Sequence, residues 1–202
     1  MDDHENPTPQ ARPGSAAEAQ VAQVAEWEAL HNAQVEEQAY LRELAGVDNL
    51  DTAESLQIVV NTTTSTISHL GGLLPRLVEL NLAGSVIESV RDLGTGFRRL
   101  EVLWLSRCGL QSLDGLSALP NLKELYASYN DISDLQPLDS CMELEVLDLE
   151  GNCVDHLDSA VMALQGCPSL TELTLTGNPV AAAPGYRAAV ASALRSLRTL
   201  DD

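Results

Sequence analysis

The side chains that could support catalysis in this sequence lie far apart, with one exception. Cys153 and His156 are three positions apart, a spacing that could bring a thiol nucleophile close to a histidine base. Such a nucleophile also needs a third group that orients the histidine, and none accompanies this pair. Cys153 follows a residue expected to be buried, and His156 precedes the core residue Leu157. We therefore expect no catalytic residue and interpret the chain as a non-enzymatic protein.

Phosphate-binding motifs are also absent from the sequence. A P-loop ends in Gly-Lys, but the only lysine, Lys123, follows Leu122. Gly94-Thr95-Gly96 begins like a dinucleotide-binding fingerprint, yet Arg99 occupies the place of the third glycine. The sequence therefore predicts no nucleotide cofactor.

Metal-binding patterns are missing as well. The four histidines are scattered without ligand spacing, and the four cysteines form no Cys-x-x-Cys pair. Asp155 and Asp158 could bind calcium weakly, but no loop gathers the oxygen ligands that calcium prefers. Asn61-Thr62-Thr63 matches a glycosylation sequon, which we interpret as a turn because no secretory signal is visible. We expect no metal or other cofactor, and we expect Cys108, Cys141, Cys153 and Cys167 to be buried thiols.

Acidic residues dominate the charge of the 202-residue chain. It holds 11 Lys and Arg against 30 Asp and Glu, so its formal net charge is −19. Nucleic acids and anionic membranes bind mainly through cationic side chains, so we expect neither as a partner. No apolar run approaches the roughly 18 residues that suggest a membrane span, and the acidic N-terminus is unlike a signal peptide. We expect a soluble, intracellular protein that is monomeric alone.

One leucine frame recurs along the chain and predicts the fold. The frame is Leu-x-x-Leu-x-Leu with starts at residues 77, 100, 122, 144 and 170, so the steps are 23, 22, 22 and 26 residues. Ala127 replaces the last leucine of the third copy. Five copies in register, each followed by further apolar positions, are typical of a leucine-rich repeat.

A small polar side chain stands eight residues after each start. The residues at these positions are Ser85, Cys108, Asn130, Asn152 and Asn178. An asparagine amide can pair with backbone groups buried in the turn after a strand, and Ser or Cys can replace it less effectively. The return segment that follows is too short for a long helix, so we expect a 3₁₀ or single helical turn there. The predicted fold is an α/β leucine-rich-repeat solenoid, with a curved parallel sheet on its concave side and short helical segments on its convex side.

Both ends of such a solenoid need a cap, because no repeat buries its own apolar face. We expect a disordered acidic and proline-rich tail (1–14), an N-terminal helical arm and cap (15–50), the repeats (51–180) and a C-terminal helical cap (181–202). Within the N-terminal cap, Val35–Leu50 should pack on the first coil. Leu56–Asn61 should form a degenerate first strand, and Leu197–Asp201 a last half-repeat.

The concave face of the predicted sheet holds an unusual pair of aromatic residues. Trp104 and Tyr126 occupy the same outward position on adjacent strands, in a chain of which only 3% is aromatic. Acidic side chains surround them, and the segment from Glu124 to Tyr186 has 11 acidic residues and no Lys or Arg. Exposed aromatic residues within an acidic rim suit a basic, amphipathic segment of another protein. The expected protein-binding residues are Glu79, Val102, Trp104, Glu124, Tyr126, Val146, Asp148, Glu150 and Glu172.

Other interpretations of this surface stay open. The two aromatic rings could simply cover one another and strengthen the sheet. Tyr129 could extend the aromatic patch or pack under its edge. Three arginines off this face, Arg98, Arg99 and Arg107, could form a second, basic contact or be solvated.

Several segments resemble a known family within the leucine-rich-repeat class. The 22-residue repeat with Asp-Gly-Leu-x-x-Leu-Pro-Asn-Leu, and the cap after Gly-Asn-Pro, resemble the class typified by the nuclear regulator of protein phosphatase 1. Residues 91–95, 103–110, 123–135 and 144–152 look like the leucine-rich-repeat-containing protein 56 family, which is ciliary and flagellar and implicated in outer dynein arm assembly. This resemblance covers residues 35–202.

The resemblance implies a non-enzymatic adaptor needed for the assembly or intraflagellar transport of outer dynein arms. Its partners would be outer-arm dynein or intraflagellar transport subunits, and it would occur in the cytoplasm and the cilium or flagellum. Two alternatives stay open at this point. One is a structural subunit that remains with dynein in the axoneme, and the other is a regulator of the protein phosphatase 1 type, suggested by the repeat class alone.

Overall fold

The computed structural model describes residues 16–201 and divides them into two compact units, one ending at Tyr40 and one beginning at Leu41. The first unit is helical, and the helix α1 (Ala16–Ala45) includes the first residues of the second unit. Its sequence is rich in Ala, Glu and Gln and contains no Gly or Pro, which favours a long helix. The expected disordered tail, residues 1–14, lies outside the described residues.

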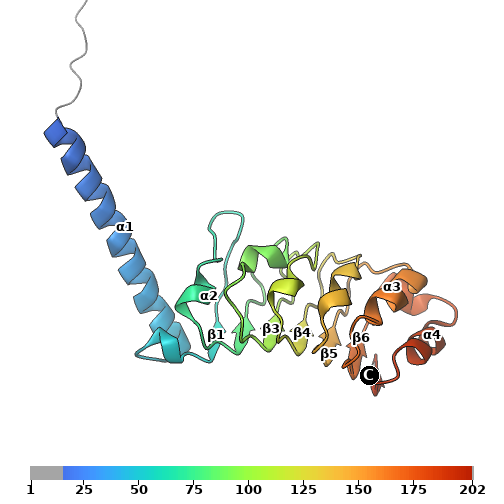
Figure 1. Cartoon of the computed structure of the whole chain (residues 1–202). Coiled ribbons are helices and arrows are strands. Elements are labelled where there is room, and N and C mark those ends of the chain that lie inside the picture. Colours follow the sequence, from blue (N-terminus) through green and yellow to red (C-terminus); the bar gives the residue numbers. More distant parts are fainter. Residues whose placement is uncertain (1–15, 202) are drawn as a thin grey trace, which may run out of the picture. The chain divides into compact units, whose positions relative to one another are not determined.

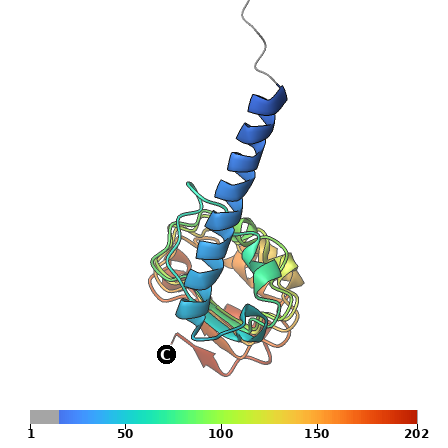
Figure 2. The ribbon, with the colours of Figure 1, turned by 90° about the vertical axis from the view of Figure 1, so that its left-hand side faces the viewer.

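The second unit is a stack of repeats whose strands form one parallel sheet. Within the described part of the chain, seven strands follow one another across the sheet in chain order, so each strand pairs with that of the next repeat. Their bounds are β1 (Ser55–Gln57), β2 (Glu79–Asn81), β3 (Val102–Trp104), β4 (Glu124–Tyr126), β5 (Val146–Asp148), β6 (Glu172–Thr174) and β7 (Thr199–Leu200). The coils follow similar paths, with the strands gathered on one side (Figures 1 and 2). This arrangement confirms the predicted leucine-rich-repeat solenoid.

Short helical segments connect the strands, and α2 and α3 lie on the side opposite the sheet (Figure 1). Most are 3₁₀ helices, as the short return segments predict, whereas the longer repeat that starts at residue 144 contains the two-turn helix α3. The bounds are η1 (Leu50–Thr52), α2 (Leu70–Leu73), η2 (Val90–Leu93), η3 (Leu116–Ala118), η4 (Gln136–Ser140), α3 (Leu157–Leu164), η5 (Pro179–Ala182) and α4 (Tyr186–Ala193).

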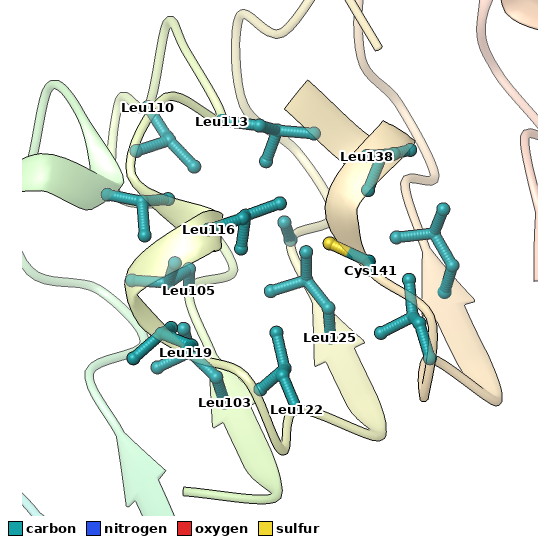
Figure 3. Close-up of a cluster of buried hydrophobic side chains, with 14 of the residues drawn as sticks. Leu103, Leu105, Leu110, Leu113, Leu116, Leu119, Leu122, Leu125, Leu138 and Cys141 are labelled. Atoms are coloured by element: carbon teal, nitrogen blue, oxygen red, sulfur yellow. The ribbon is translucent and has the colours of Figure 1, made fainter. Parts of the chain in front are cut away.

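Leucines from the sheet and from the return segments form a continuous core between the two sides (Figure 3). Leu103 and Leu125 are the middle residues of β3 and β4, are directly paired and are fully buried. Leu116 and Leu119, from η3 and the residue that follows it, complete the same cluster. Because side chains alternate along a strand, the two residues that flank each central leucine face away from this core.

Buried asparagines satisfy the backbone in the turns, as predicted. The side chain of Asn130 accepts hydrogen bonds from the N–H groups of Cys108 and Leu110 at 2.9 and 3.0 Å. Its Nδ2 donates to the carbonyl oxygen of Leu105 at 2.8 Å, so a single amide joins two coils. Asn152 and Asn178 are buried and bonded in the same way.

Smaller side chains take the same position in the first two coils and make fewer bonds. The hydroxyl of Ser85 accepts a hydrogen bond from the N–H of Val60 at 3.0 Å. The thiol of Cys108 contacts the carbonyl oxygen of Leu82 at 3.2 Å. Ser85 and Cys108 therefore each make only some of the hydrogen bonds that an asparagine amide would make at this position.

The beginning of the second unit is only partly as predicted. Leu41, near the end of α1, is 1% exposed and belongs to the core, whereas the packing expected for residues 35–40, which lie in the first unit, stays a prediction. β1 ends at Gln57, and the rest of the predicted first strand forms only an isolated bridge at Asn61. After this bridge the chain turns, because the side chain of Asn61 accepts a hydrogen bond from the N–H of Thr63.

A side chain replaces a backbone hydrogen-bond partner at the C-terminal end of the sheet. In the interior coils, the N–H of the residue five positions after the frame start donates to a carbonyl of the next strand, as Leu149 does to Thr174. In the last coil, Leu175 instead donates to Oδ1 of Asp201 at 2.7 Å. Tyr186 of α4 is 4% exposed, and burial together with the Asp201 carboxylate raises the pKa of its hydroxyl. Asp201 and Tyr186 therefore help to cover the last apolar layer at the C-terminal end of the repeat stack.

Candidate protein-binding face

The register of the sheet brings the predicted binding residues onto one surface, here called the open sheet face. Eight of the nine lie in β2 to β6, on either side of the buried leucines, and Glu150 follows β5 by two residues. One row across the sheet is Glu79, Val102, Glu124, Val146 and Glu172. The next row contains Trp104, Tyr126 and Asp148. None of the nine is buried, so all of them contribute to the solvent-accessible surface.

Trp104 and Tyr126 form a parallel stack at the centre of this face. Their ring centroids are 3.8 Å apart and their planes are inclined by 12°. Each side chain is half-buried, because each ring covers one face of the other. Mutual coverage is what the alternative interpretation expected, and the partly exposed rings still provide an apolar platform. The stack is therefore compatible with strengthening the sheet and with binding a partner.

The stack also contains one unpaired donor. Among the described residues, Nε1 of Trp104 is buried and has no hydrogen-bond partner. A buried donor without an acceptor destabilises a fold by about 1–3 kcal/mol.

The hydroxyl of Tyr126 is surrounded by carboxylates. It donates a hydrogen bond to Oε2 of Glu124 at 2.8 Å. Burial, followed by the hydrogen bond to Glu124 and then by the charges of Glu124, Glu172 and Asp148, raises the pKa of Tyr126 to about 12. The hydroxyl therefore stays protonated at neutral pH and holds Glu124 in place beside the aromatic pair.

These carboxylates are not neutralised by neighbouring cations. Ion pairs in the repeat unit join Lys123 to Glu101 at 2.8 Å and Arg91 to Asp114 at 3.4 Å, both away from the open sheet face. Within residues 16–201, the carboxylates of that face make no ion pair. The face is therefore an aromatic patch inside a negative field, to which a cationic surface would be attracted.

Two residues at the border of this face were not part of the predicted site. Arg107 and Tyr129 follow β3 and β4, and Cζ of Arg107 lies 4.7 Å from the centre of the Tyr129 ring. The hydroxyl of Tyr129 donates to Oε1 of Glu150 at 2.6 Å. Both residues have a positive φ, which the sequence could not show because neither is glycine. Their place in the frame, which is glycine in three other repeats, was the available signal.

The cysteine prediction was wrong at one position. Cys108, Cys141 and Cys167 are buried, and burial raises the pKa of their thiols. Cys153 is exposed, because it lies between two inward-facing residues and so points outward. His156, three residues later, is also exposed, and its Nε2 lies 3.6 Å from Oδ1 of Asp155.

The glycines that suggested a nucleotide fingerprint have a packing role. A Cβ on Gly96 would lie 2.7 Å from the Cα of Gly71, so the two backbones require glycine at their contact. Gly94 has a φ of +76° and a Cβ there would meet Ser68. In the part of the chain that the structure describes, no three His, Cys, Asp or Glu side chains gather as metal ligands. The described helices include none with the length and apolar character to cross a membrane.

Comparisons with known proteins agree with the repeat pattern. A family model described as "Leucine-rich repeat" matches residues 75–202. The chain is 45% identical to leucine-rich repeat-containing protein 56 of Homo sapiens over 98% of its own length and 37% of that protein. It is 38% identical to dynein axonemal assembly factor 11 of Trypanosoma brucei brucei, over 66% of this chain and 34% of that protein. The chain spans about a third of the length of the curated relatives it matches.

Solved structures support the same architecture. An internalin from Listeria monocytogenes superposes with a TM-score of 0.55 and 20% identity, covering 72% of this chain and 40% of that one. At this identity the likeness concerns the fold alone.

Proposed function

The chain belongs to the leucine-rich repeat family, and from this premise we propose that it is a non-enzymatic, protein-binding adaptor for the assembly or intraflagellar transport of outer dynein arms. Similarity to leucine-rich repeat-containing protein 56 and to a dynein axonemal assembly factor links the chain to dynein arms. In this role it would act in the cytoplasm and in the cilium or flagellum, and it would be monomeric without its partner.

The observation that carries the proposal is the Trp104–Tyr126 stack inside a ring of unpaired carboxylates. Aromatic residues supply most of the binding energy in many interfaces, and a rigid stack loses little conformational entropy when it binds. Glu124 is held beside the stack by the Tyr126 hydroxyl, so its charge is already positioned. A surface of this kind fits a basic, amphipathic segment of an outer-arm dynein or intraflagellar transport subunit.

The central experiment is affinity purification of the tagged full chain from ciliating cells, with the bound proteins identified by mass spectrometry. The wild type is compared with Trp104→Ala/Tyr126→Ala, and we expect outer-arm dynein or transport subunits with the wild type only. Met142→Ala/Met162→Ala is the matched control, because these methionines are 57% and 74% exposed and lie outside the open sheet face. Recovery of the same subunits with all three proteins would contradict the proposed site. A phosphatase catalytic subunit in place of ciliary proteins would contradict the proposed function.

A further inference from the structure

The residue seven positions after each frame start lies in the left-handed region of backbone conformation. The five residues and their φ values are Gly84 (77°), Arg107 (59°), Tyr129 (57°), Gly151 (65°) and Gly177 (78°). Glycine adopts this conformation without a steric penalty, whereas a residue with a Cβ is strained there. Two adjacent coils therefore carry a strained arginine and a strained tyrosine where glycine would fit better.

These two residues and Glu150 form one assembled unit, here called the turn edge. The guanidinium of Arg107 stacks on the ring of Tyr129, and the Tyr129 hydroxyl binds Glu150. The ring also lies against Gly151, where a Cβ would be 2.7 Å from Cδ1 of Tyr129. The glycine at residue 151 thus makes room for the tyrosine of the preceding coil.

Stability of the fold does not explain the turn edge. Tyr129 is 47% exposed and Arg107 is exposed, so their contact with each other is largely hydrated. Exposed cation–π contacts and surface hydrogen bonds contribute little, and the strain of two left-handed residues opposes them. Strained non-glycine residues that project into solvent are instead typical of functional surfaces.

The charge of Arg107 distinguishes the turn edge from the rest of the surface. The neighbouring open sheet face is acidic, and from Glu124 to Tyr186 the sequence has no Lys or Arg. Within the described residues the guanidinium of Arg107 has no ion-pair partner, and its Cζ lies 4.7 Å from the centre of the Tyr129 ring. A guanidinium whose N–H groups are not engaged in an ion pair can bind a carboxylate with two hydrogen bonds.

We propose that the turn edge is a second contact for the same partner, and that Arg107 binds an Asp or Glu side chain flanking the basic stretch that covers the open sheet face. This inference rests on the proposed binding of a basic segment by that face. It adds a requirement for charges of both signs in the bound segment, and it fixes which end of that segment lies over the coils that contain β3 and β4.

The test uses fluorescein-labelled synthetic peptides that share one amphipathic core of Lys, Arg and Leu. Two Glu residues are added at the N-terminal end or at the C-terminal end, and matched peptides carry two Gln at the same places. Binding to the full chain is measured by fluorescence anisotropy. Because the protein has a net charge of −19, non-specific attraction should make both Glu peptides bind more weakly than the Gln peptides.

We expect one of the two Glu peptides to bind about fivefold more tightly than its Gln counterpart, which is the effect of one partly exposed ion pair. Arg107→Gly should abolish this preference, whereas Arg99→Ala, which removes an exposed arginine elsewhere, should keep it. Arg107→Gly should not lower the melting temperature, because glycine relieves the strain at this position. A lower melting temperature would mean that the turn edge serves the fold.

The remaining outcomes separate the two proposals. Tight binding of the Gln peptides with weaker binding of both Glu peptides would overturn the turn-edge contact and leave the open sheet face in place. A preference for one Glu peptide that survives Arg107→Gly would also overturn the turn-edge contact and leave the open sheet face in place. Failure of every peptide to bind the wild type would contradict the basic-segment site itself.

Discussion

The indole of Trp104 lies face to face with the ring of Tyr126, with centroids 3.8 Å apart and planes inclined by 12°. The sheet register causes this relationship, because the two residues are directly paired on the adjacent strands β3 and β4. Cross-strand aromatic pairs stabilise a sheet by about 0.2–1 kcal/mol, which is less than the same rings can contribute when a partner covers them. The pair can therefore be tested separately for stability and for binding.

Removal of either ring should weaken binding far more than folding. Trp104→Ala and Tyr126→Ala should each weaken partner binding by about 2 kcal/mol or more. Each should lower the free energy of unfolding by only about 1 kcal/mol, because the rings are half-buried and the core leucines stay in place. Denaturant unfolding and titration of the purified partner measure the two effects. If Trp104→Ala unfolds the protein, the residue belongs to the core and the assignment of the open sheet face is wrong.

The conservative variant Trp104→Phe refines this test. It keeps a stacking ring and removes the buried Nε1 donor that lacks a partner. Because the loss of ring area and the loss of an unpaired donor oppose one another, the free energy of unfolding should change by less than about 1 kcal/mol. A much larger loss would show that the indole nitrogen is bonded in solution. Leu125→Ala is the contrasting core variant and should cost about 2–5 kcal/mol.

The buried asparagines at residues 130, 152 and 178 should be more important to stability than any residue of the open sheet face. Asn152 donates to the carbonyls of Ala127 and Leu149 and accepts from the N–H of Ile132. Asn152→Ala leaves these buried backbone groups unpaired, so the free energy of unfolding should fall by about 3 kcal/mol or more. Asn152→Asp keeps an acceptor but introduces a buried charge and should be at least as harmful. A loss below about 1 kcal/mol for Asn152→Ala would show that water replaces the amide.

The leucine frame made most of the fold predictable, because burial repeats with the same period as the sequence. It located Leu103, Leu125 and their equivalents in the core, and simple alternation then located Trp104 and Tyr126 on the opposite side of the sheet. The frame could not predict the parallel stacking of the two rings, since rotamers depend on the packing of neighbouring side chains. For the turn edge it offered only an indirect signal, because Arg107 and Tyr129 take a position that is glycine in three other repeats and their own residue types do not indicate a left-handed backbone.

The exposure of Cys153 gives a direct chemical test of the coil geometry. Cys108, Cys141 and Cys167 are buried, and burial raises the pKa to about 11 for Cys141 and about 12 for Cys167. Since the thiolate is the reactive form, these three thiols should resist a disulfide reagent in the native protein. Cys153 should react quickly, and unfolding should release all four thiols. A Cys153→Ser variant that still shows one fast native thiol would contradict the described burial.

The raised pKa of Tyr126 predicts how stability depends on alkaline pH. Burial and the carboxylates of Glu124, Glu172 and Asp148 raise this pKa to about 12 in the folded protein. An unfolded tyrosine titrates near pH 10, about where the stabilisation from the Tyr126 proton begins to be lost. The folded state holds the proton more tightly, so this stabilisation is complete below that pH and disappears as the pH rises toward the folded value. The difference in unfolding free energy between the wild type and Tyr126→Phe should accordingly shrink between about pH 10 and pH 12. The other tyrosines are the same in both proteins, so their titration cancels in this comparison.

Glu124→Gln identifies the cause of the shift. The amide still accepts the hydrogen bond of the Tyr126 hydroxyl but removes the nearest negative charge. The pKa of Tyr126, followed by phenolate absorbance as a difference from Tyr126→Phe, should therefore fall toward its ordinary value while burial keeps part of the elevation. A Glu79→Gln variant is the control, because Glu79 lies on the same face but is not among the groups that raise this pKa. An equal fall in both variants would indicate that the whole acidic face acts on Tyr126, and an unchanged pKa in both would leave burial and the retained hydrogen bond as the causes.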